Sequence, residues 1–242
     1  LEQLQELGVV DISRSVKPVD QDSSEMFAKV TRAKKTLEYL EGINFAKDAD
    51  AEAIAKATVT VEGDPVDFIE QCRTKLGELN TSLANAEKQM KVRLPWGEYD
   101  KKAIDGLGEL GYTVRYYCVD LKKYDSAWSE LQPLQVINND GDKVWFVTVA
   151  PKNEAYSFPV QEVAAPEGTY AEAAAEAAHI KAEIIECKAG LLNAKDYIPA
   201  IKEACNKELV DLDRYLADSA ASSAAFPAFA AMDEVQSSSS AM

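Results

Sequence analysis

Hydrophobic residues recur at alternating spacings of four and three in three stretches of the chain. This is the period of one face of an α-helix. The first stretch predicts a helix over about residues 22–41, with Gly42 as its stop. Its apolar seam consists of Met26, Val30, Ala33, Leu37 and Leu40.

The second stretch predicts a helix over residues 65–92. Asp64 supplies an N-cap, and Pro65 suits the first helical turn. A strict seven-residue repeat of apolar positions is typical of a coiled coil rather than of a globular helix. The repeat comprises Ile69, Cys72, Leu76, Leu79, Leu83, Ala86 and Met90.

The third stretch is the longest and predicts a helix from about residue 169 to residue 216, about 70 Å at about 1.5 Å per residue. Because a compact domain of this size cannot enclose such a helix, we expect it to return alongside the first two. The outgoing arm is then 22–92, broken at 42–63, and the returning arm is 169–218. Pro199 falls opposite the break, where we expect a kink. The apolar positions are Ala173, Ala177, Ile180, Ile184, Cys187, Leu191, Ala194, Ile198, Ile201 and Cys205.

Between the two arms, residues 93–168 have the pattern of a small distal α/β lobe. Its strands are rich in β-branched and aromatic residues, and the sequence NNDGD around Gly141 is a hairpin turn signal. The expected elements are a helix over 100–110, a strand over 112–119, a helix over 121–131, strands over 134–137 and 143–149, and a last short strand over 158–163.

The two ends of the chain have a different character. Residues 1–21 begin with a helix–strand pattern and predict part of a proximal α/β lobe that other sequence must complete; the chain, which does not begin with Met, reads as a piece of a longer protein. Residues 219–242 form an Ala- and Ser-rich low-complexity tail, either a frayed linker or a further element. The expected fold class is α+β: a long, mostly helical antiparallel coiled-coil hairpin with a small α/β lobe at its far end and a partial second lobe near the termini.

Charge and cysteine content exclude several functions. The net charge is −15, from 41 acidic and 26 basic residues, which argues against nucleic acid or an anionic membrane as a partner. No apolar run approaches the roughly 20 residues that span a bilayer, so we expect no direct membrane insertion by this chain. Four cysteines without a CxxC spacing, and one histidine, predict neither a zinc site nor a disulfide framework, and favour a reduced, cytoplasmic setting.

The chain carries no recognisable catalytic motif. It has no phosphate loop, no GxSxG and no HExxH, and its glycine cluster DGLGELG (105–111) follows a helix instead of joining a strand to a helix. Asp140 and Asp142 are better explained by a turn than by a weak cation site. We therefore expect a protein that is not an enzyme, with no catalytic residue, no cofactor and no metal site.

The sequence RLPWGEYD (93–100) ends the second helix abruptly. Pro95 restricts the backbone, Trp96 is costly to leave in water, and Gly97 permits a tight turn. Taken alone, these residues stop the helix and turn the chain toward the lobe.

Three segments carry a resemblance to a known family: Leu4–Ser13 (LQELGVVDIS), Pro95–Asp100 (PWGEYD) and Ile104–Arg115 (IDGLGELGYTVR). They resemble the cytoplasmic N-terminal region of V-type ATP synthase subunit I, the counterpart of subunit a in V-type ATPases. The resemblance implies a non-catalytic stator strut at the cytoplasmic face of a membrane, anchored through a membrane domain missing from this chain. It also implies binding to the peripheral-stalk subunits and to other central and membrane subunits during proton or sodium transport. In such a strut, Pro95, Trp96, Gly97 and Tyr99 are the expected junction and partner site, which either only stops the helix or also fixes the lobe rigidly to the helical arm.

Two other readings stay open. One is an unrelated scaffold with an antiparallel coiled coil. The other is a regulatory module that binds a small ligand in the lobe over 98–163, which a deep apolar pocket with converging polar groups would support.

Overall fold

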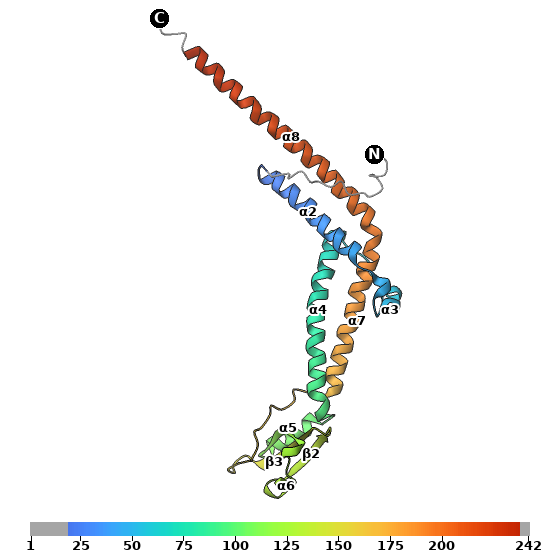
Figure 1. Cartoon of the computed structure of the whole chain (residues 1–242), viewed down its shortest axis with the longest axis vertical. Helices are drawn as coiled ribbons and strands as arrows, with labels where there is room; N and C mark the ends of the chain where they lie inside the picture. The colour runs from blue at the N-terminus through green and yellow to red at the C-terminus, as the bar shows by residue number, and fades with distance from the viewer. Residues whose placement is uncertain (1–18, 238–242) are drawn as a thin grey trace. The chain divides into compact units, whose positions relative to one another are not determined.

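The structure, a computed structural model, describes residues 19–237, with side chains up to residue 224 (Figure 1). It is mostly helical with one three-stranded antiparallel sheet, which confirms the α+β class. The contacts divide the chain into two compact units, described separately below: Leu1–Lys75 with Ile185–Met242, and Leu76–Ile184. Most of the predicted partial proximal lobe, residues 1–18, lies outside the described residues.

The first unit is helical. It contains α2 (Gln21–Gly42), η1 (Phe45–Lys47), α3 (Ala51–Lys56), the start of α4 (Pro65–Arg93), the end of α7 (Tyr170–Ala194), η4 (Lys195–Tyr197) and α8 (Ile198–Ser237). Helix α2 begins at a capping box in which the Asp20 side chain and the Ser23 side chain each bind the other's backbone N–H.

Helices α2 and α8 lie side by side and antiparallel (Figure 1). The hydroxyl of Tyr215 donates to Asp20 at 2.7 Å, and the thiol of Cys205 lies 4.0 Å from the carbonyl oxygen of Val30. Much of the core of this unit is made of seam residues, among them the buried side chains of Val30, Leu37, Leu40, Ile69, Leu191 and Ile201. The predicted helical faces therefore supply a large part of the core.

Three boundaries in this unit differ from the prediction. The break over 42–63 contains the short helix α3, whose Ile54 is buried. The single helix expected over 169–216 is interrupted at Lys195–Tyr197, because Pro199 has no N–H and its ring crowds the carbonyl of residue 195. Helix α8 continues to Ser237, past the expected end at 216, through an alanine-rich segment that favours helix.

The second unit begins with the rest of α4 and ends with the first part of α7. Here Ala86, Ala177, Ile180 and Ile184 form a buried cluster. Half-buried residues of the α4 repeat pack against it: Leu76, Leu79, Leu83 and Met90. Lys181 bridges to Glu87 at 3.3 Å beside the cluster. The two predicted seams thus meet over this stretch.

The small lobe follows α4. It contains η2 (Leu94–Trp96), α5 (Lys101–Glu109), β1 (Tyr112–Asp120), η3 (Leu121–Lys123), α6 (Trp128–Leu131), β2 (Leu134–Asn139) and β3 (Lys143–Pro151). The strand order is β1-β3-β2, antiparallel throughout. The three strands match the predicted strands within two residues at each end.

Two predicted elements of the lobe are wrong. The helix over 121–131 reduces to η3 and the four-residue α6, because the Asp125 side chain accepts the N–H of Ala127 at 2.9 Å and starts a new turn there. The strand over 158–163 is a single bridge, from Val163 to Tyr116. Both segments instead contribute aromatic rings to the lobe core.

One face of the sheet carries this aromatic core. Tyr117 stacks on Phe146 with ring centroids 5.1 Å apart, and Trp128 and Phe158 pack around them. The hydroxyl of Tyr156 lies 2.6 Å from both the Tyr117 hydroxyl and the Thr148 hydroxyl, so these buried polar groups have partners. Burial raises the pKa of Tyr117. The opposite face of the sheet is where the predicted junction lies.

Candidate functional site

The predicted junction residues come together where α4 meets the sheet. Trp96 ends the 3₁₀ turn of η2 and is 8% exposed. Its ring meets Tyr116 of β1 edge to face, with centroids 5.4 Å apart and planes at 81°. Pro95 lies within the same turn, where its missing N–H leaves no helical bond unmade. The large apolar ring is therefore held against the sheet directly after the helix.

Gly97 allows the chain to change direction after Trp96. Its φ of 66° and ψ of −150° are a conformation that residues with a Cβ rarely adopt. Its N–H donates to the carbonyl of Leu94 at 3.2 Å and closes the turn. The sequence prediction of a glycine-dependent corner is thus met by the backbone geometry.

Tyr99 fastens the segment that leaves the lobe to the segment that enters it. Its hydroxyl donates to the carbonyl of Pro166 at 3.1 Å. One residue earlier, the Glu98 carboxylate accepts the backbone N–H of Ala171 in the first turn of α7 at 2.8 Å. Burial, followed by the nearby charge of Glu172, raises the pKa of Tyr99. The two connections between lobe and helices are therefore bonded to each other.

A cavity of about 170 Å³ lies behind the junction. Trp96, Tyr99 and Tyr116 supply aromatic walls, and the remaining lining is aliphatic or proline. The aliphatic and proline residues are Ile104 and Leu107 of α5, Val114 of β1, Ile137 of β2, Val147 and Val149 of β3, and Pro166. Among the described residues, no charged side chain lines it.

Sequence reasoning missed this cavity, although part of its pattern was readable. Ile104 and Leu107 are three apart on one face of α5, and Val147 and Val149 alternate along β3, so each pair shares a face. The pattern does not predict that a cavity lies between the α5 residues and the β3 residues. Ile137 is harder still to foresee, because the β2 register shifts between Val136 and Asn138 and leaves it without a partner on β3.

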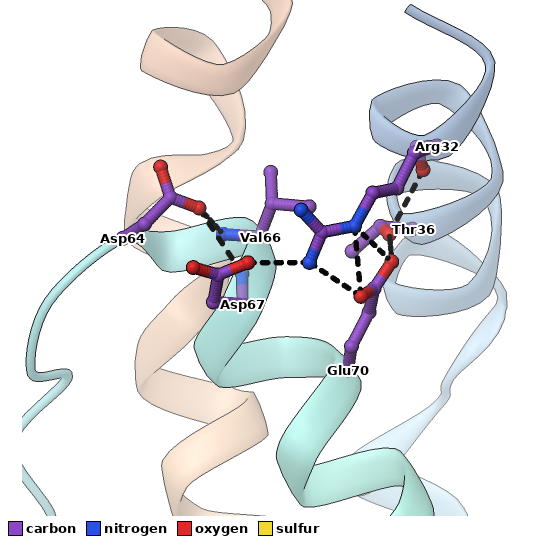
Figure 2. Close-up of polar contacts among 6 residues, drawn as sticks. All are labelled: Arg32, Thr36, Asp64, Val66, Asp67 and Glu70. Carbon is purple, nitrogen blue, oxygen red and sulfur yellow. Dashed lines mark hydrogen bonds and ion pairs between the residues drawn. The ribbon is translucent and has the colours of Figure 1, made fainter. Parts of the chain in front are cut away.

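A second polar cluster links helices within the first unit (Figure 2). The Nε of Arg32 in α2 donates to both carboxylate oxygens of Glu70 in α4 at 2.9 Å, and its Nη2 contacts Asp67 as well. Thr36 donates to Glu70 at 3.3 Å, and the Asp64 side chain caps α4 by accepting the N–H of Val66 at 2.9 Å.

This Arg32 cluster has a structural role, because it joins α2 to α4. The hydrogen bonds from Arg32 are the main reason that the pKa of Glu70 lies below its ordinary value. The Arg32 side chain is 47% exposed, which limits the energy of the ion pairs through solvent screening. Arg32 pairs with both Asp67 and Glu70, so the cluster is explained by its role in joining α2 to α4.

The remaining candidates have ordinary structural roles. The Asp140 carboxylate accepts the N–H groups of Asp142 and Lys143 at 2.9 and 2.8 Å, which supports the turn reading and lowers its pKa. His179 is 76% exposed on the side of α7 and pairs with Glu183 at 3.2 Å. Burial, followed by the nearby Cys187, raises the pKa of Cys72 to about 11, so this thiol is not an activated nucleophile.

The described part of the chain, residues 19–237, contains neither a candidate metal site nor a candidate bilayer-spanning helix. Within that range, no three His, Cys, Asp or Glu side chains are placed to hold a metal ion. None of the helices there is both long enough and apolar enough to cross a bilayer.

Comparison with known proteins leaves the family open. No protein-family model matches the chain, and no curated protein is significantly similar to it.

Proposed function

We propose that the protein is a non-catalytic stator strut of a rotary V-type ATPase or ATP synthase. In this proposal α4 and α7 form a long antiparallel hairpin, and the small lobe at its end binds the peripheral-stalk subunits. A membrane domain outside this chain would anchor the strut at the cytoplasmic face of a membrane and take part in proton or sodium transport.

One observation carries the proposal: the connection that enters the lobe packs on the sheet and is hydrogen-bonded to the connection that leaves it. Trp96 packs on Tyr116, Tyr99 donates to Pro166, and Glu98 accepts from the first turn of α7. A lobe that transmits force to a two-helix arm needs such double attachment, because a single flexible connection would let it swivel. The resemblance of PWGEYD and LQELGVVDIS to the family directs this mechanical role to a rotary ATPase.

Binding to the cognate peripheral-stalk heterodimer tests the proposal. Isothermal titration calorimetry of the whole chain should show binding in the micromolar range or weaker, since a strut gains strength from several attachments acting together. A variant in which a short glycine–serine linker replaces residues 98–166 should lose that binding. Unchanged binding after this replacement would contradict the role of the lobe, and tight binding of ATP would contradict a non-catalytic strut.

A ligand-binding module is the second candidate function, because of the cavity behind Trp96. The cavity has the apolar lining expected of such a site but lacks converging charged groups. An unrelated coiled-coil scaffold is supported by the α4–α7 packing alone, and the calorimetry above separates it from a stator strut.

A further inference from the structure

We propose that the cavity behind Trp96 is a binding site for a small uncharged molecule built around one aromatic ring. This inference does not rest on the stator role. It follows from the size, the lining and the mouth of the cavity.

The size of the cavity fits a single ring. Its volume is about 170 Å³. An enclosed apolar protein cavity of about 150 Å³ takes up benzene, and the cavity here has a similar volume but is open on one side. An apolar guest that replaces the solvent against its walls removes apolar surface from water and gains dispersion contacts. Drug-sized ligands need larger pockets and are excluded.

The lining selects an uncharged guest. Its side chains are aliphatic, aromatic or proline, and the Tyr99 hydroxyl already donates to Pro166. A carboxylate or phosphate would lose its hydration without gaining an ionic partner, which is strongly unfavourable. The aromatic walls of Trp96 and Tyr116 instead offer ring faces and edges to an aromatic guest.

The mouth of the cavity is apolar and open to solvent. Ile137 lines the cavity and is 41% exposed. It sits at the register shift of the edge strand β2, and such irregularities often turn a side chain toward a binding site. Its neighbour Val136 is similarly exposed, at 37%, but stands opposite Phe146, on the aromatic-core face of the sheet. The two residues therefore form a matched pair for testing.

Methyl NMR of the whole chain during a titration with benzene tests the site. We expect saturable shifts of the Val114, Val147 and Val149 methyl groups, and no such shifts with benzoate, which carries the same ring and a charge. Ile137→Trp should block the mouth and weaken benzene binding at least about tenfold, a difference of about 1.4 kcal/mol. Val136→Trp should change the affinity less than about twofold.

Circular dichroism and the melting temperature establish that each variant is folded. Should Ile137→Trp unfold, Leu107→Trp, which places a much larger ring at the cavity wall on α5, replaces it with the same expected loss of binding. Absence of saturable shifts with benzene overturns the proposal. Equal binding of benzoate, or equal affinities for the Ile137→Trp and Val136→Trp variants, overturns it as well.

Discussion

Trp96 and Tyr116 meet edge to face, with ring centroids 5.4 Å apart, although they are 20 positions apart in the sequence and lie on a 3₁₀ turn and a strand. This contact ties the end of α4 to the first strand of the lobe. It is also one wall of the cavity, so the same pair links the stability of the lobe to its capacity for a ligand.

Removing the Trp96 ring should therefore destabilise the lobe strongly. Trp96→Ala is expected to lower the free energy of unfolding by about 3 kcal/mol or more, as large truncations of buried rings do. Urea denaturation, monitored by circular dichroism, measures this change in the free energy of unfolding. Leu94→Ala is the matched control, because Leu94 lies in the same turn but is 58% exposed, and its effect should stay within about 0.5 kcal/mol. Equal effects of the two substitutions would show that Trp96 is not buried.

Two glycines of the lobe should respond to alanine with opposite signs. Gly97 has φ of 66°, so Gly97→Ala should destabilise by about 1–3 kcal/mol through backbone strain. Gly106 lies inside α5 with open space around its Cα, so Gly106→Ala should stabilise by about 0.5–1 kcal/mol. Melting temperatures of the two variants give the signs. A neutral Gly97→Ala would contradict the corner geometry.

The sequence pattern predicted those parts of the fold that depend on local periodicity. The seams of α4 and α7 are where packing occurs, as with Leu83 against the cluster around Ile180, because a repeat of apolar positions needs an apolar partner. The corner at Trp96 could also be predicted, since proline, tryptophan and glycine each have a strong local preference. Contacts between residues far apart in the sequence could not be predicted from the pattern.

The Arg32 cluster shows this limit. Arg32 and Glu70 are 38 positions apart, and both look like ordinary charged residues on solvated helix faces. The cavity could not be predicted from the sequence pattern either, because its volume depends on the distance between α5 and the sheet. The helix predicted over 121–131 fails for a local reason: η3 ends before Tyr124, and the Asp125 side chain starts a new turn ahead of α6. The rings of Tyr124 and Trp128 pack around Phe146 in the aromatic core.

The contribution of the Arg32 cluster to stability should depend on pH. The bonds from Arg32 lower the pKa of Glu70, so their stabilisation is present above the ordinary glutamate pKa and is lost as the pH falls through the lowered value. Glu70→Gln should therefore cost about 0.5–1 kcal/mol at pH 7, a small value because the side chain is 39% exposed, and less at pH 3.

Urea unfolding of wild type and variant at both pH values measures this difference. Glu38→Gln, at an exposed position of α2, is the control and should have little effect at either pH. A cost for Glu70→Gln that grows toward acid pH would contradict the lowered pKa.

Cys72 should be slow to alkylate in the folded protein. It lies on α4 near Cys187 of α7, in the stretch where a Cβ at Gly190 would come within 3.0 Å of the Phe68 ring, so the helices are closely packed there. Burial and Cys187 raise its pKa to about 11, whereas an ordinary thiol titrates near 8.5. Because only the thiolate reacts, alkylation by iodoacetamide at pH 8 should be on the order of 100-fold slower than in the unfolded chain.

Mass spectrometry of the Cys72 peptide, with and without urea, gives the ratio of the two alkylation rates, and the native rate should rise steeply toward pH 11. Equal native and unfolded rates would mean that α4 and α7 separate readily around Cys72, and would contradict the close packing there.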